Sequence, residues 1–215
     1  MLILAIDTAL SACSVAIVRD GETLTSCVEP MARGQAERLA PMVRDAMDEV
    51  DVRFDQLDRI AVTRGPGAFT GLRVGLAFAR GLALALNIPC VGLSTLEVLA
   101  AKASEPRIVA AIEVAGSLFA GAWEGRHEII QLCRTDMDTL LSRLDNNWAV
   151  TGPGSLSILA ARPEWHYVQQ NLPDPVILAY LAAHLDPDKS APDPLYLRGV
   201  DAKLAGGLLL PESLR

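Results

Sequence analysis

Two short segments carry residues suited to binding a phosphate or a hydrated cation. Asp7 ends an apolar run and is followed by Thr8 and Ser11, so its carboxylate could hold a hydrated Mg²⁺ beside a phosphate. Gly65 and Gly67 flank a proline before an expected helix, where backbone N–H groups can bind an anion. A structural role fits as well: an Asx turn at Asp7 and a tight turn at the glycines. Asp7, Thr8, Gly65 and Gly67 are the nucleotide-binding candidates, although the loop matches no standard nucleotide motif.

The sequence holds no signature of a metal site or a nucleophile. Its three histidines, at positions 127, 166 and 184, are far apart, and neither H-E-x-x-H nor H-x-x-x-H occurs. Cys13 has no histidine near it in the sequence to activate its thiol. We therefore expect no metal centre and no catalytic residue.

An apolar helix expected over residues 71–87 carries a binding signal. Its only charges, Arg73 and Arg80, are seven residues apart on one face, and the opposite face is apolar as well. The helix is therefore either enclosed within its own lobe or shared with a partner, and arginine, a common interface anchor, favours the partner. A neighbouring helix over residues 35–50 has an apolar stripe of its own. The predicted partner-binding residues are Arg73, Leu76, Ala77, Arg80, Leu84, Leu39 and Met42.

The hydrophobic pattern of the sequence predicts the strands and helices that position these candidate residues. Three strands are expected over residues 2–7, 12–19 and 22–28, with a turn at residues 20–21. The helix over residues 35–50 follows, and then a strand over residues 59–63 leads into the glycine loop. A short strand over residues 90–93 and a helix from about residue 94 complete this unit.

Residues 107–133 repeat the opening pattern at an offset of 106, with residues 109–113 over residues 3–7 and Cys133 over Cys27. The loop recurs in outline, as TRGPG at residues 63–67 and TGPG at residues 151–154. The sequence thus predicts an α/β fold of two lobes, each opening with a three-stranded meander, although any two meanders look alike at this level. We expect a partner-binding N-terminal lobe over residues 1–106, a C-terminal lobe over residues 107–186, and a Pro-rich tether and docking tail over residues 187–215.

Composition restricts the class of protein. The chain has 215 residues, 51% hydrophobic and 21% charged, as in a globular protein. Its net charge of −7 argues against binding of nucleic acid by this chain without a partner protein, because such binding depends on Lys and Arg side chains that neutralise phosphates. Four cysteines without a C-x-x-C pair, and no leader, predict a reduced cytoplasmic protein. The longest uncharged run, residues 81–96, is too short and too broken for a membrane span.

Several motifs together resemble the TsaB (YeaZ) family. They are LILAIDTA at residues 2–9, CSVA at 13–16, RGPGAFTGLRVG at 64–75, GLA at 81–83, GLSTL at 92–96 and PLYLR at 194–198. They cover most of residues 1–100 and a segment near the C-terminus. The resemblance implies the duplicated fold of acetate kinase, actin and Hsp70 (the ASKHA fold), which agrees with the internal repeat.

The resemblance also implies a function. Members are non-catalytic scaffold or dimerisation subunits, required with the paralogue TsaD and the ATPase TsaE for threonylcarbamoyl transfer to the adenosine beside the tRNA anticodon. TsaD binds a metal through His-x-x-x-His, and these histidines align with Thr95 and Leu99, so no metal is expected here. We expect a homodimer when the chain is alone, tRNA contact only through the complex, no membrane contact, and no cofactor except ATP or ADP at a subunit junction.

One segment departs from the family, and one enzyme function competes with the scaffold. Residues 113–119 read EVAGSLF where the family has Asp-x-Arg-x-Gly-Glu-x-Tyr, which puts in doubt any polar contact of that segment with another subunit. The alternative is an ATP-dependent phosphotransferase using Asp7 and the loop from Gly65 to Gly67. The second lobe has about 80 residues before the tether and no glycine-rich adenosine loop beyond residues 152–154, which disfavours a complete nucleotide cleft. A peptidase lacks any metal or Ser/His/Asp set.

Overall fold

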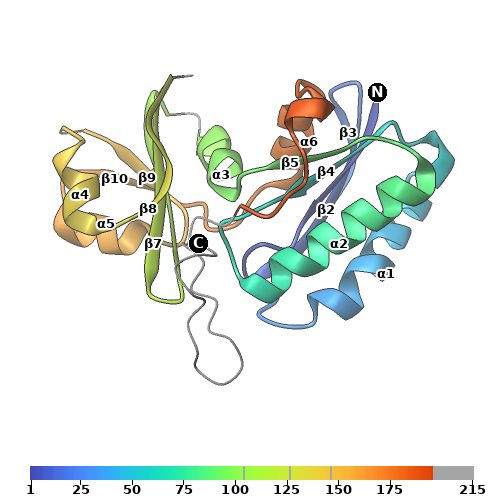
Figure 1. Ribbon diagram of the computed structural model, residues 1–215, viewed down its shortest axis with the longest axis horizontal. Coiled ribbons are helices and arrows are strands. Elements are labelled where there is room, and N and C mark those ends of the chain that lie inside the picture. The colour runs from blue at the N-terminus through green and yellow to red at the C-terminus, as the bar shows by residue number, and fades with distance from the viewer. Residues whose placement is uncertain (104, 126, 146, 196–215) are drawn as a thin grey trace, which may run out of the picture.

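The computed structural model describes residues 1–103, 105–125, 127–145 and 147–195, and it contains two five-stranded sheets (Figure 1). The first sheet consists of β1 (Leu2–Asp7), β2 (Ala12–Arg19), β3 (Glu22–Pro30), β4 (Arg59–Thr63) and β5 (Cys90–Leu93), in the order β3-β2-β1-β4-β5. The second consists of β6 (Arg107–Val114), β7 (Ser117–Glu124), β8 (His127–Thr135), β9 (Ala149–Thr151) and β10 (His166–Val168), in the order β8-β7-β6-β9-β10.

Six α-helices within the described residues follow or join these strands. They are α1 (Gln35–Glu49), α2 (Phe69–Leu86), α3 (Thr95–Ala103), α4 (Met137–Ser142), α5 (Ser155–Ala161) and α6 (Pro175–Ala183). Two short 3₁₀ turns, η1 (Phe54–Gln56) and η2 (Pro187–Lys189), lie after α1 and α6. The predicted two-lobed α/β fold, with a three-stranded meander opening each lobe, is confirmed.

The two meanders superimpose in sequence at an offset of 105 residues, so the predicted offset of 106 is wrong by one. Leu2 pairs with Arg19 in the first lobe, and the corresponding residues Arg107 and Glu124 pair in the second. The error arises because β1 and β6 are continuous apolar runs, whose sequences look alike after a slip of one residue. Such a slip nevertheless exchanges the two faces of a strand.

The corrected register changes which residue of the second lobe corresponds to Asp7. Asp7 lies opposite Ser14, and the pair at the same place in the second lobe is Ile112 and Phe119. Ile112 is fully buried, whereas Glu113 is exposed on the other face of β6. The second lobe therefore has an apolar side chain at the position of Asp7.

Two helices join the lobes, because each packs on the sheet that is not its neighbour in sequence. Helix α3 follows the first sheet in sequence, but its Leu96 and Leu99 pack with Ile112 of the second sheet. Helix α6 follows the second sheet, but its Leu178 and Ala182 pack on the first. Figure 1 shows α3 between the sheets and α6 against the first. The predicted boundary at residue 106 lies between the last strand of the first sheet and the first strand of the second. Helix α6, which falls within the lobe expected over residues 107–186, packs on the first lobe.

Helices α1 and α2 cover the other face of the first sheet. In α1, Leu39 and Met42 are each 1% exposed and belong to the core of this lobe. The outward positions of α1 carry exposed polar side chains such as Glu37, Arg44 and Asp45. The prediction that Leu39 and Met42 bind a partner is therefore wrong, because the apolar stripe of α1 is used within its own lobe.

Helix α2 approaches the turn after β1 very closely. Gly67, Gly71 and Gly75 follow one another at four-residue spacing and lie on one side of α2 and the loop before it. A Cβ atom on Gly71 would lie 2.1 Å from the carbonyl oxygen of Thr8, and one on Gly67 would lie 2.3 Å from that of Ala9. The Thr8 hydroxyl donates a hydrogen bond of 2.7 Å to the Gly71 carbonyl. These glycines therefore serve close packing of backbone on backbone.

The chain after η2 forms an extended segment, residues 190–195, which we name the strap. The Gly92 N–H donates to the Ser190 carbonyl at 2.9 Å, and the Leu195 N–H donates to the Arg64 carbonyl at 2.8 Å. The strap thus lies along the edge of β5. The rest of the predicted docking tail, from residue 196 onward, lies outside the described residues.

Gly71→Ala tests the close approach of α2 to β1. The added methyl would overlap the Thr8 carbonyl, so we expect the free energy of unfolding to fall by more than about 2 kcal/mol. The control is Gly81→Ala, an exposed site on the same helix where a Cβ meets nothing within 4 Å. There alanine should raise stability by about 0.5–1 kcal/mol. Urea unfolding measures both variants, and a Gly71→Ala protein as stable as the wild type would contradict this packing.

Candidate functional site

Asp7 lies at the end of β1 with its side chain fully buried. Its Oδ1 accepts hydrogen bonds from the Thr63 hydroxyl at 2.5 Å and the Ala9 N–H at 3.2 Å. Its Oδ2 has no partner among the described residues, nor does the buried hydroxyl of Ser14, directly opposite on β2. Burial raises the pKa of the Asp7 carboxyl to about 6, although both hydrogen bonds lower it. This carboxyl therefore changes its charge not far below neutral pH.

A cavity between the lobes, of about 310 Å³, does not include the predicted nucleotide-binding residues. Its lining consists of Leu10, Ser11, Ala68, Glu113, Val114, Gly152, Pro153, Leu156, Tyr167, Asn171 and Leu172. Ser11 is thus present, whereas Asp7, Thr8, Gly65 and Gly67 are absent from this lining. The Glu113 carboxylate, which accepts a hydrogen bond of 2.9 Å from Ser157, adds a negative charge that opposes a bound phosphate.

Some backbone amides at the two glycine loops donate hydrogen bonds within the protein. The Ala68 N–H donates to the Ala9 carbonyl at 2.7 Å. In the second lobe, the Gly152 N–H donates to Gln170 at 2.9 Å and the Gly154 N–H donates to Ala111 at 3.0 Å. An anion cradle requires N–H groups that are free to face the ligand. The amides of Ala68, Gly152 and Gly154 are therefore not free for an anion, and nucleotide binding at the predicted residues stays a prediction.

The candidate metal positions are occupied by side chains packed in the core. Thr95 and Leu99, which the resemblance aligns with the histidines of TsaD, are both fully buried on α3. Across the described ranges of the chain, no three His, Cys, Asp or Glu side chains come together as a possible metal site.

The outward face of α2 presents apolar side chains to solvent. Leu84 is 84% exposed and Phe69 is 59% exposed. The Arg73 guanidinium carbon lies 3.8 Å from the centre of the Phe69 ring, a cation–π contact. Ala77 and Arg80 are exposed as well. The spacing of three or four residues places all five on one face, which we name the α2 stripe: Phe69, Arg73, Ala77, Arg80 and Leu84.

Leu76 does not belong to this stripe. It is 3% exposed and packs in the core of the first lobe, so the prediction that Leu76 contacts a partner is wrong. Helix α2 is wedged against both the sheet and α1, and its buried arc is wide enough to include Leu76. Arg73, Ala77, Arg80 and Leu84 are exposed, and their binding to a partner stays a prediction.

Helix α2 is long and apolar enough to pass as a membrane span by length and composition alone. A single helix of this kind is weak evidence for a span, because core helices pass the same test. Only 28% of residues Phe69–Leu86 are buried, yet the side of the helix that carries the glycines packs on the turn after β1. The expectation that its exposed apolar side chains bind a partner stays a prediction.

A groove borders the α2 stripe at the start of the helix. It has a volume of about 480 Å³ and lies between the beginnings of α1 and α2, with Gln35, Phe69 and Val74 among its lining residues. Phe69 belongs to both the groove and the stripe. The two features form one continuous surface, which the helix pattern alone did not predict.

Sequence reasoning missed three polar residues of these sites. Ser14 was detectable, because the register of a hairpin from β1 to β2 places it opposite Asp7. Tyr167 and Asn171, which line the cavity between the lobes and share a hydrogen bond of 2.9 Å, had no comparable signal. Tyr167 lies on a strand of three residues, which is too short to show a period.

Two similar lobes facing each other across a cavity define this chain as a duplicated α/β protein of the acetate kinase, actin and Hsp70 class. The family model TsaD, described as tRNA N6-adenosine threonylcarbamoyltransferase, matches residues 29–143. The chain is 35% identical over 167 residues to the tRNA threonylcarbamoyladenosine biosynthesis protein TsaB of Escherichia coli, covering 72% of each chain. It belongs to the TsaB (YeaZ) family.

Solved structures agree with this assignment. YeaZ from Pseudomonas aeruginosa superimposes with a TM-score of 0.78 at 29% identity, covering 91% of this chain and 99% of that one. The ethanolamine utilization protein EutJ from Carboxydothermus hydrogenoformans, at 12% identity and a TM-score of 0.52, covers 83% of this chain and 89% of its own. The likeness to EutJ concerns the fold alone. The family resemblance expected from the sequence motifs is confirmed.

Asp7→Asn tests the buried carboxyl. The pKa of Asp7 is about 6 in the folded protein against an ordinary value of 3.8, so the protonated form favours folding. This contribution is complete below about pH 4 and is lost as the pH rises through about 6. Asn keeps an acceptor for Thr63 and Ala9 without a charge, so the variant should gain about 2–3 kcal/mol relative to wild type between pH 4 and pH 7.

Urea unfolding at a series of pH values measures this gain. The control is Asp188→Asn in η2, an exposed site whose stability difference from wild type should not change over the same range. A difference between Asp7→Asn and wild type that stays flat with pH would contradict the buried carboxyl.

Proposed function

We propose that this protein is a non-catalytic subunit in the formation of threonylcarbamoyladenosine in tRNA. It pairs with a TsaD homologue, which transfers the threonylcarbamoyl group to the adenosine beside the anticodon, and a TsaE-type ATPase joins the pair in the cytoplasm. The biosynthesis role in the name of the Escherichia coli relative supports the pathway. tRNA contact belongs to the complex, because a chain with a net charge of −7 is poorly suited to gripping a phosphate backbone.

The α2 stripe is the observation that carries this proposal. Burying Leu84 and Phe69, which are 84% and 59% exposed, would stabilise a complex by at most about 1.5–3 kcal/mol each. Ala77, between them, allows a close approach by the partner backbone. Aromatic and arginine side chains are enriched in protein interfaces, and Arg73 is already ordered over Phe69.

The non-catalytic role has separate support. Thr95 and Leu99 offer no metal ligands of the kind that a pair of histidines supplies. Asp7, the central residue of the phosphotransferase alternative, is enclosed and does not line the cavity between the lobes, where Glu113 opposes a phosphate. We therefore do not propose the phosphotransferase function.

Ala77→Asp tests partner binding through α2. The change places a carboxylate in the middle of the stripe, where a partner would desolvate it, so affinity for the purified TsaD homologue should fall by several kcal/mol. Threonylcarbamoyl transfer to tRNA in the reconstituted system should fall with it. Ala77 is exposed, so the isolated variant should stay folded and lose no more than about 0.7 kcal/mol of stability, the helix-propensity cost of aspartate.

The matched control is Ala40→Asp, the same substitution at an exposed position of α1 outside the stripe. It should bind the TsaD homologue as the wild type does. Leu76→Asp is unsuitable for this purpose, because a carboxylate in the core would unfold the lobe. Wild-type affinity and transfer in Ala77→Asp would rule out the proposed binding face.

Self-association is expected when the partner is absent. The exposed apolar stripe of one copy can cover that of another, so light scattering at micromolar concentration should give about twice 23.0 kDa. Leu84→Asp should shift the population to monomer without loss of folding, because Leu84 is exposed. A wild-type monomer over this concentration range would contradict the homodimer.

A further inference from the structure

We propose that the strap, residues 190–195, is a second part of the surface that binds the TsaD homologue, because it places Asp193 beside Arg80 in the middle of the α2 stripe. This inference rests on the proposed function and deepens it. It adds a contact segment more than 100 residues away in sequence from the helix that carries the stripe.

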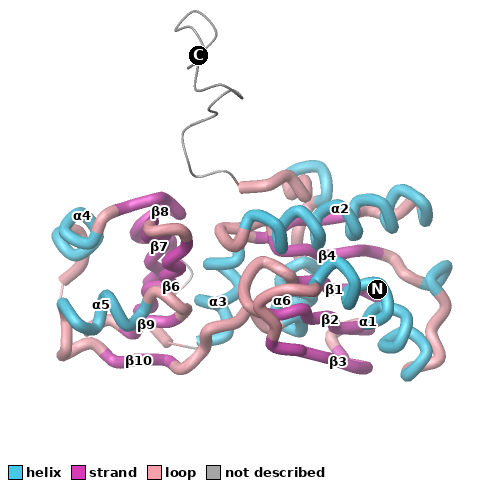
Figure 2. Tube along the Cα trace, turned by 90° about the horizontal axis from the view of Figure 1, so that it is seen from below, coloured by secondary structure: helices cyan, strands magenta, loops and turns pink. Residues whose placement is uncertain are grey.

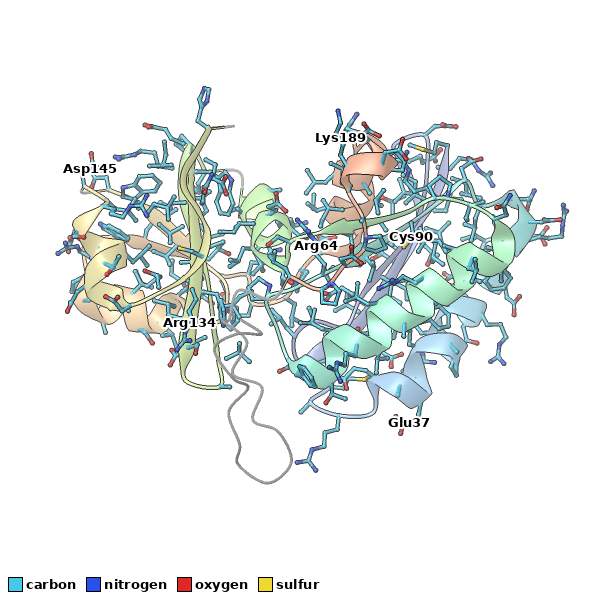
Figure 3. The ribbon with its side chains drawn as sticks, viewed as in Figure 1. Glu37, Arg64, Cys90, Arg134, Asp145 and Lys189 are labelled. Carbon is cyan, nitrogen blue, oxygen red and sulfur yellow. The ribbon has the colours of Figure 1, made fainter. Side chains whose placement is uncertain are left out.

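The strap is attached at both ends. Hydrogen bonds join Ser190 to Gly92 and Leu195 to Arg64. A Cβ atom on Gly92 would lie 2.8 Å from the Cα of Pro192, so the absence of a side chain at Gly92 makes room for the strap. Figure 3 labels Lys189, directly before the strap, and Arg64, where the strap ends. The strap is therefore a fitted element of the first lobe.

The strap and α1 lie on opposite sides of α2. Helix α1 packs over β2 and β3, towards one edge of the first sheet, whereas the strap follows β5 at the other edge. Figures 1 and 2 both show α2 between α1 and the segment that follows α6. A partner seated on the α2 stripe would thus have α1 on one side and the strap on the other.

An ion pair joins the strap to the stripe. Arg80 Nη1 lies 3.6 Å from Asp193 Oδ1, and the two side chains are 54% and 68% exposed. A pair so open to solvent adds little to folding. Arg80 lies between Ala77 and Leu84 in the stripe, so a partner that covers both must also cover this pair. Exclusion of water would then strengthen the attraction, which points to recognition as the role of the pair.

The surface also defines the chemistry that the partner must offer. The apolar members Phe69, Ala77 and Leu84 require an apolar face. Asp193 brings a carboxylate to the rim of that face, and a carboxylate has more acceptor sites than one arginine fills. The matching face of the TsaD homologue should therefore carry a hydrogen-bond donor, a lysine or arginine by preference, opposite the strap.

Asp193→Lys tests this role directly. It replaces the carboxylate by an ammonium group beside Arg80, so the dissociation constant with the purified TsaD homologue should rise by about tenfold or more. The unfolding temperature of the variant alone should match that of the wild type, because both side chains are exposed. The control is Asp188→Lys in η2, the same charge change before the strap begins, which should leave affinity within about twofold.

Gly92→Val tests the seating of the strap without a charge change. Its side chain would displace Pro192, so affinity for the TsaD homologue should fall while circular dichroism remains that of a folded chain. If Gly92→Val fails to fold, Asp193→Lys still decides the question, because Asp193 is exposed and lies outside the core.

The outcomes separate this inference from the proposed function. Wild-type affinity in Asp193→Lys overturns the inference and leaves the proposed function standing. Failure of the wild-type protein to bind the TsaD homologue overturns the proposed function instead. A change in self-association alone, with unchanged affinity for the TsaD homologue, would assign the strap to a second copy of the chain and also overturn the inference.

Discussion

The close contact between α2 and the turn after β1 sets the geometry of the first lobe. Because Gly71 meets the Thr8 carbonyl without a side chain between them, the backbone of α2 lies almost on the strand. The sheet, α1 and this turn together enclose one side of the helix. The α2 stripe is what remains outside, so the glycine loop that resembles a phosphate loop leads into a helix with apolar side chains exposed to solvent.

The packing of α3 and α6 on the sheet of the opposite lobe holds the two lobes together. Helix α3 covers the inner face of the second sheet, and helix α6 covers the inner face of the first. Each sheet is therefore completed by a helix whose sequence neighbours lie in the other lobe. The Oδ2 atom of Asp7 and the hydroxyl of Ser14, which have no partner within the described part of the chain, do not line the cavity between the lobes. The carboxyl of Asp7 is thus buried within the first lobe, apart from the cavity between the lobes.

Local patterns predicted the elements well, because alternation and helical spacing reflect burial on one side of each element. The repeat predicted the duplication, but β1 and β6 are continuous apolar runs without alternation, so their sequences could not distinguish an offset of 106 from 105. The offset was decided by the pairing of Leu2 with Arg19 and of Arg107 with Glu124. Leu76 was misplaced because helical spacing gives the direction of an apolar face and not the width of the buried arc. The proximity of Asp193 to Arg80 was beyond prediction, since it depends on the path of a chain segment across the finished fold.

The packing of α6 on the first sheet also bears on how the chain is made. The strands of the first sheet are complete at Leu93, but α6, which covers their inner face, begins at Pro175, roughly 80 residues later. At about 10 residues per second, the ribosome needs about eight seconds to synthesise the segment between them. During that time Ile3, Ala5 and Val91 lack their final cover. The inner face of the first sheet therefore remains partly uncovered until α6 has been synthesised.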